Sequence, residues 1–154
     1  MNDPARMYRE SAVRYASPVG LVVILYEEII RSLRKAHQAM QQNAIEQRCR
    51  SLTHAIQVIG HLQSVLDYEK GAEVAQNLSK FYNVARNVIL QCNNSGSGDR
   101  LISLAGDFSN LARAWQQVDH EVSKAPDATA LQAAIQQIPL ANLNPPAPRL
   151  RVQR

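Results

Sequence analysis

The chain's 154 residues fit one domain that can bury a core without disulfides or a structural metal. Apolar residues make up 45% of them and aromatic residues only 5%, a balance that favours helices packed through aliphatic side chains over a β-sandwich. Arg149, Arg151 and Arg154 supply most of the net charge of +4, so the rest of the chain is nearly neutral and lacks the basic face that nucleic-acid binding requires.

Proline residues mark the ends of the predicted helical part. They occur at 4 and 18 and then not before 126, and a helix interior excludes proline because it removes a hydrogen bond and clashes with the preceding turn. We therefore expect an N-terminal cap segment over residues 1–16, a helical bundle over 17–125, and a short helix with a proline-rich flexible tail over 126–154. The first residues lack the apolar stretch of a secretory signal and no apolar run is long enough to span a membrane, so we expect a cytoplasmic protein.

The first predicted helix begins at Ser17 and Pro18 and runs to about residue 42. A serine N-cap followed by proline at the first helical position is a typical helix start. An apolar stripe over residues 22–40 is widened by further apolar residues on other faces: Leu21, Val23, Ile24 and Ile30. Such a helix lies at the centre of a bundle or is covered on a second side.

Three further amphipathic helices follow, over about 46–69, 72–92 and 99–122. Gly71 is expected to end the second helix, the Asn, Ser and Gly residues of 93–98 to form the next turn, and Asp99 to cap the fourth helix. Short connections make neighbouring helices antiparallel. The sequence thus predicts an all-α antiparallel four-helix bundle, with a short fifth helix over residues 127–138 as an addition.

The sequence contains no group of residues that suggests a catalytic, cofactor-binding or metal-binding site. The Glu-x-x-His pairs of a di-iron bundle are missing. His54 and His61 share a helix face, but neighbouring isoleucines indicate that another face is buried, so both are expected to point to solvent. Cys49 and Cys92 lack the spacing of zinc ligands and are expected to be ordinary buried thiols. We therefore predict a protein that is not an enzyme.

The first helix has more apolar surface than a four-helix core uses. Either the chain's own N-terminal segment, with Met7, Tyr8 and Val13, completes the core over this surface, or a partner helix binds there as in a groove. The pattern alone leaves both alternatives open.

Three blocks of residues follow one another in a fixed order. The first comprises Tyr8, Val13, Ala16, Ser17, Pro18, Leu25, Tyr26, Glu27 and Ile30. The second comprises Leu66, Asp67, Gly71, Glu73, Val74, Ala75, Asn77, Leu78, Phe81 and Tyr82. The third comprises Leu111, Ala114 and Trp115. In this order and at these separations, the blocks resemble the pattern of the flagellar secretion chaperone family FliS over residues 8 to about 122.

The resemblance implies a bundle that captures the C-terminal segment of newly made flagellin, prevents its premature polymerisation and delivers it to the flagellar type III export gate, without a cofactor. It also implies that the N-terminal segment covers a hydrophobic site and moves aside for cargo. The implied cap and helix-start residues are Tyr8, Val13, Ala16, Ser17 and Pro18. The implied groove residues are Leu25, Tyr26, Ile29, Ile30, Ala75, Leu78 and Tyr82.

Three positions depart from the family pattern: Tyr15, Glu28 and Ala72. They keep open a second hypothesis, a secretion or assembly adaptor of the same fold with a different cargo. A third hypothesis is a nucleic-acid or anionic-surface binder that acts through the three arginines of the tail. The sequence favours neither nucleic acid as a partner nor stable membrane insertion, and it leaves the formation of homo-oligomers open.

Overall fold

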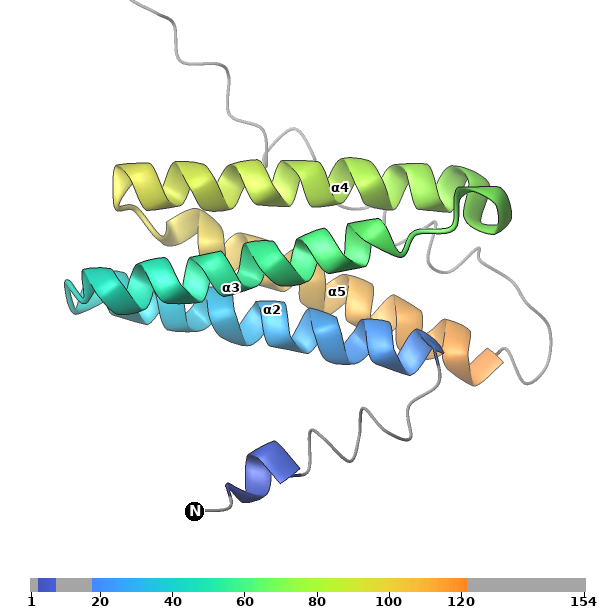
Figure 1. Ribbon diagram of the computed structural model, residues 1–154, viewed down its shortest axis with the longest axis horizontal. Coiled ribbons are helices and arrows are strands. Elements are labelled where there is room, and N and C mark those ends of the chain that lie inside the picture. Colours follow the sequence, from blue (N-terminus) through green and yellow to red (C-terminus); the bar gives the residue numbers. More distant parts are fainter. Residues whose placement is uncertain (1–2, 8–17, 122–154) are drawn as a thin grey trace, which may run out of the picture.

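The computed structural model describes residues 3–7 and 18–121, and the side chains among them up to Val118. Its main part consists of the helices α2 (Pro18–Gln41), α3 (Ile45–Ser64), α4 (Tyr68–Ser95) and α5 (Asp99–Glu121) (Figure 1). The described residues contain helices and turns but no strand, so the all-α prediction is confirmed. Residues 8–17 and the predicted fifth helix lie outside the described residues, and the expected segment boundaries stay predictions.

Helix α2 lies at the centre of the packing. It packs along both α3 and α5, and α4 packs on the same two helices, so that α2 and α4 face each other across the core (Figure 1). Four side chains of α2 are fully buried: Tyr26, Ile29, Leu33 and Ala36. Because α2 contacts neighbours on two sides, as the sequence predicts, much of its broad apolar surface is buried, while Leu21 stays exposed.

Helix α3 ends earlier than the sequence predicts, at Ser64 rather than near residue 69. The Asp67 carboxylate accepts hydrogen bonds from the backbone N–H groups of Glu69 and Lys70, at 3.1 and 3.0 Å. A side-chain cap of this kind contributes about 1 kcal/mol to helix stability. The predicted boundary was therefore wrong, because the Asp67 cap starts α4 already at Tyr68.

Gly71 precedes a kink inside α4 instead of separating two helices. Ala72 has a φ of 42° and a ψ of −117°, a backbone conformation that costs a residue with a side chain about 1–3 kcal/mol. A Cβ atom at Gly71 would lie 2.9 Å from the Ala75 Cβ atom, so the bend is tightly packed. Glycine thus marks an interruption of regular helix geometry, but this interruption bends one helix and does not separate two.

The turn between α4 and α5 is shorter than predicted. Helix α4 extends to Ser95, and Gly96, with a φ of 72°, ends it in a left-handed conformation. Asp99 is the first residue of α5 rather than the residue that caps it. A Cβ atom at Gly98 would lie 2.9 Å from the Met40 Sδ atom, so glycine there lets the start of α5 approach the end of α2.

We expect Ala72→Gly to stabilise the fold by about 1 kcal/mol, because glycine adopts this conformation without strain and the Ala72 side chain is exposed. In thermal unfolding followed by circular dichroism, this corresponds to a rise in Tm of about 3–5 °C. The matched control is Gln76→Gly, an exposed position in the regular part of α4, which should lower Tm. A fall in Tm for Ala72→Gly would contradict the presence of strain at this residue.

Candidate functional site: an apolar groove at one end of the bundle

Four aromatic side chains from three helices meet in the core: Tyr26, Phe81, Tyr82 and Phe108. The Tyr26 ring of α2 meets the rings of Tyr82 and Phe108 edge-on, with centroids 6.4 and 5.3 Å apart. The Phe81 ring lies 5.0 Å from the Phe108 ring. Aromatic pairs contribute about 0.5–1.5 kcal/mol beyond the area that they bury, so this cluster holds α2, α4 and α5 together.

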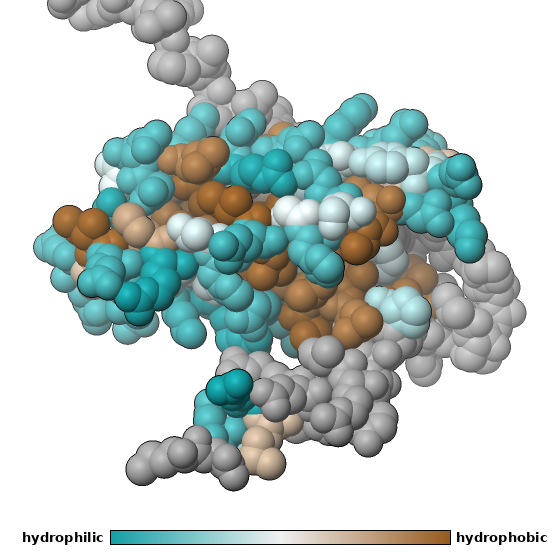
Figure 2. Space-filling model, in the orientation of Figure 1, coloured by the Kyte–Doolittle hydropathy of each residue, from teal (hydrophilic) through white to brown (hydrophobic). Residues whose placement is uncertain are grey.

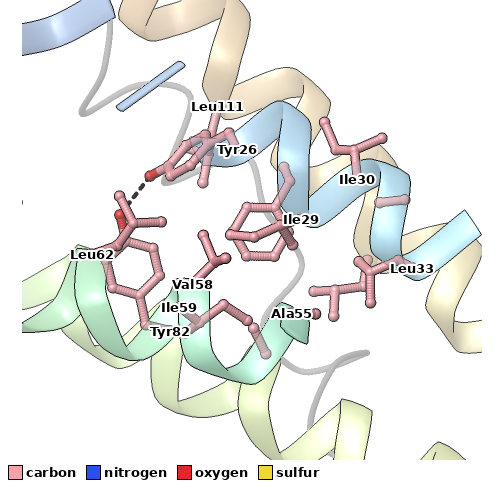
Figure 3. Packing of buried hydrophobic residues seen from close by; sticks show 14 of the residues in the cluster. Tyr26, Ile29, Ile30, Leu33, Ala55, Val58, Ile59, Leu62, Tyr82 and Leu111 are labelled. Atoms are coloured by element: carbon pink, nitrogen blue, oxygen red, sulfur yellow. Dashed lines mark hydrogen bonds between the residues drawn. The ribbon is translucent and has the colours of Figure 1, made fainter. Parts of the chain in front are cut away.

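The hydroxyls of Tyr26 and Tyr82 form a hydrogen bond across the core. The two oxygen atoms are 2.7 Å apart, and either one can be the donor (Figure 3). The Trp115 Nε1–H group also donates to the Tyr26 oxygen, at 3.3 Å. We call these three side chains the hydroxyl junction.

Burial raises the pKa of both phenols of the hydroxyl junction further above physiological pH. It raises the pKa of Tyr26 to about 12, although hydrogen bonds from Tyr82 and Trp115 offset part of the effect. Burial likewise raises the pKa of Tyr82 well above its ordinary value. The junction is therefore an uncharged polar contact inside an apolar core at physiological pH.

An apolar groove opens at the end of the bundle where α2 and α4 begin and α3 ends. Its volume is about 210 Å³. We call it the end groove, and its lining comes from all four helices and the α3–α4 connection: Val22, Leu62, Val65, Leu66, Asp67, Gly71, Val74, Ala75, Leu78, Tyr82 and Trp115. Since Tyr82 and Trp115 belong to the hydroxyl junction, the junction forms part of the groove wall.

Exposed apolar side chains accompany the end groove. Val65, which lines it, is 58% exposed, and Tyr68, one residue after Asp67, is 51% exposed. Leu21, next to Val22, is exposed as well. Figure 2 shows apolar surface gathered over the first half of α2 and the second half of α3. An apolar groove continued by exposed apolar side chains is typical of a surface that binds a partner.

The structure brings part of the predicted groove set together. Ala75, Leu78 and Tyr82 line the end groove. Tyr26 is fully buried behind them and is bonded to Tyr82. These four residues come from α2 and α4, and their clustering makes them the predicted residues best placed to act at this site.

The other predicted residues lie elsewhere or outside the described part. Ile29 and Ile30 are buried further along α2, in the core rather than in the groove lining (Figure 3). Leu25 is half-buried against the core, and Pro18 is exposed at the start of α2. The predicted cap residues outside the described part are Tyr8, Val13, Ala16 and Ser17.

Sequence reasoning missed the contribution of α3 and α5 to the groove. Leu62, Val65 and Leu66 belong to the apolar stripe of the second predicted helix, the last two beyond the observed end of α3 at Ser64, and Trp115 stands in the third sequence block. Helical periodicity identifies such residues as apolar and inward-facing. It does not tell which helix ends meet, and so it gives no reason to place them in one groove.

Glu28, a departure from the family pattern, lies outside the end groove in a surface cluster. Its carboxylate forms an ion pair with Arg31 and a hydrogen bond with His54 of α3, whose Nε2 atom lies 3.0 Å from Oε1. Partial burial raises the pKa of Glu28, but the hydrogen bonds and charges of Arg31 and His54 outweigh it, so the pKa is lowered overall. Glu28 thus links α2 to α3. His54 and His61 are exposed, as predicted.

Other reactive groups in the described part of the chain are dispersed. Among its residues, no three His, Cys, Asp or Glu side chains are gathered as metal ligands. Cys92 is buried and Cys49 half-buried, both as free thiols, and burial raises the pKa of Cys92. None of the helices described combines the length and the apolar character that crossing a membrane requires.

The fold and the end groove define the class of protein, a small helical bundle with an apolar groove at one end. The chain belongs to the FliS family of flagellar secretion chaperones, because the family model described as "Flagellar protein FliS" matches residues 1–122. The match includes the four long helices and the residues before them. The resemblance predicted from the three sequence blocks is thereby confirmed.

Similar proteins from several bacteria carry the description flagellar secretion chaperone FliS. The one from Salmonella typhimurium is 33% identical over 120 residues, which cover 77% of this chain and 89% of the relative. The one from Campylobacter jejuni is 30% identical over 118 residues, with 77% and 92% covered. The one from Bacillus subtilis is 23% identical over 117 residues, with 76% and 86% covered. The similarity thus extends over most of each relative.

We expect Tyr82→Phe to destabilise the fold by about 1 kcal/mol, since it removes a buried hydrogen bond and keeps the ring. Tyr26→Phe should cost about 1–2 kcal/mol, because it also deprives the Trp115 Nε1–H group of its acceptor. In urea unfolding, the double variant should cost less than the sum of the single variants, by about 0.5–1.5 kcal/mol. Additive costs would show that the two hydroxyls do not interact.

Proposed function

We propose that this protein is a cytoplasmic export chaperone for flagellin. In this proposal the end groove and the apolar surface beside it bind the C-terminal segment of flagellin, prevent premature polymerisation, and keep the segment available for the flagellar type III export gate. Membership of a family of flagellar secretion chaperones supports this function. The observation that carries it is the end groove, an apolar cavity lined from all four helices.

The exposed apolar residues explain why a partner would bind with useful affinity. Val65 and Tyr68 are each more than half exposed. A partner helix that covers them removes their apolar surface from water, which stabilises the complex by about 25 cal/mol for each Å² buried. The resemblance implies that the terminal segments of flagellin are amphipathic helices that pair only in the filament. The free energy of the apolar contacts in a preformed groove offsets the entropy that such a segment loses when it becomes ordered.

The N-terminal segment is proposed as a cover for the same site. Helix α2 begins at Pro18, and Val22, in its second turn, lines the end groove. Residues 8–17 therefore join the bundle close to the groove. Tyr8 is the best candidate for an anchor, because a phenol brings both apolar area and a polar tip to an interface.

An adaptor for a different cargo is the competing proposal, and its support comes from the departures at Tyr15, Glu28 and Ala72. Glu28 is engaged with Arg31 and His54 away from the groove lining. Ala72 directly follows the lining residue Gly71, so this departure lies at the bend of α4 beside the groove. Tyr15 lies outside the described residues. Of the two departures among the described residues, only Ala72 lies at the groove. This small difference from the family pattern favours flagellin over another cargo as the partner.

We expect Val65→Asp to weaken flagellin binding at least tenfold without lowering Tm, because it places a charge in the apolar contact while the side chain is exposed in the free protein. The matched control is Ile102→Asp, which introduces the same charge at a position 44% exposed in the first turn of α5. Isothermal titration with flagellin from the same organism measures the affinity of both variants. Equal weakening by the two variants, or no complex with the unaltered chain at tens of micromolar, would contradict the proposal.

We expect Tyr8→Ala to raise cargo affinity severalfold and to leave Tm nearly unchanged, since removal of a cover increases the fraction of molecules with an open groove. Titration and thermal unfolding of the full chain give the two quantities. A large fall in Tm with unchanged binding would instead place Tyr8 in the core.

A further inference from the structure

The end groove lies close to the point where the described part of the chain ends. Trp115 of α5 lines the groove, and α5 ends at Glu121. At 1.5 Å per residue, Glu121 is about 9 Å further along the helix axis. The described part of the chain therefore ends near the groove.

The sequence that follows α5 contains one amphipathic segment, residues 127–138. Its larger apolar residues recur at helical spacing, namely Leu131, Ile135 and Ile138, and Ala134 lies on the same face. Asp127 stands at the position of an N-cap, and Pro139 follows as a helix stop. A helix of this length measures about 18 Å, so the sequence predicts a short helix with a single apolar stripe.

The connection is long enough for this segment to reach the groove. Residues 122–126 span up to about 18 Å when extended. A segment that turns back along α5 therefore reaches the level of Trp115, which is only two turns from the end of that helix.

The chemistry of the segment and that of the groove are compatible. The only charged residue in the groove lining is Asp67, and its carboxylate is occupied by the N–H groups of Glu69 and Lys70. Within residues 127–138 the only charged residue is Asp127, outside the apolar stripe. Docking of the stripe thus buries apolar surface on both sides without burying an unpaired charge.

We infer that the chain's own C-terminal segment, residues 127–138, docks its apolar stripe in the end groove and competes there with the groove's partner. The inference rests on the proposed function for the identity of that partner. A ligand attached through a short connection acts at an effective concentration of about a millimolar, so even weak docking competes with the N-terminal cover and with cargo. Cargo must then displace the segment, which lowers its apparent affinity.

The intrinsic fluorescence of the protein reports on this contact, because Trp115 is the only tryptophan of the chain. In the full-length protein, Leu131→Asp/Ile135→Asp should raise acrylamide quenching of Trp115 about twofold and shift its emission to the red. The control Ala133→Asp/Gln136→Asp adds the same charges to the opposite face and should behave like the unaltered chain. Unchanged quenching in the stripe variant would overturn the inference. A rise seen only with Tyr8→Asp/Val13→Asp would also overturn it.

Two additions to the stripe variant separate this inference from the proposed function. A synthetic peptide of residues 127–138 should restore the low quenching, and its failure to protect Trp115 would overturn the docking. Flagellin should bind the stripe variant severalfold more tightly than the control variant. Equal binding to both would overturn competition while the proposed function stands. If flagellin binds neither the stripe variant nor the control variant, but the quenching of Trp115 responds as expected, the proposed function fails and the docking stands.

Discussion

The hydroxyl junction of Tyr26, Tyr82 and Trp115 is the contact on which the arrangement of the helix ends depends. It joins α2 and α4, which face each other across the core, and ties both to α5. An unpaired hydroxyl in this position costs about 1–3 kcal/mol, so packings that bring the three groups together are favoured by about that amount. Because Tyr82 and Trp115 also line the end groove, the same contact shapes part of the groove wall.

The end groove itself results from where two helices end and bend. Asp67 starts α4 soon after α3 has ended at Ser64, and Ala72 then kinks the new helix within its second turn. The apolar stripe of α3 thus continues into Val65 and Leu66, beyond the last residue of the helix. Both features lie at the groove, since Asp67 and Gly71 belong to its lining and Ala72 follows directly.

The four helices could be predicted from the sequence because proline spacing, periodicity and short connections depend on local physics. Pro18 starts α2 as expected. The predicted boundary near Gly71 was wrong, because the Asp67 side chain caps α4 and starts it before the glycine. Of the groove, Ala75, Leu78 and Tyr82 could be predicted through the family pattern. Val65 and Trp115 could not, because their role depends on which helix ends meet. Glu28 needed the structure, which shows its partner His54 on another helix.

The central claim is that the C-terminal segment of flagellin lies in the end groove. Its most direct test is a photocrosslinking amino acid in place of Val65 in the full chain, illuminated with flagellin from the same organism, followed by mass spectrometry of the linked peptides. The account predicts crosslinks to the C-terminal segment of flagellin, and none when the same group replaces Ile102. Crosslinks from both positions alike, or from position 65 to other parts of flagellin, would contradict it.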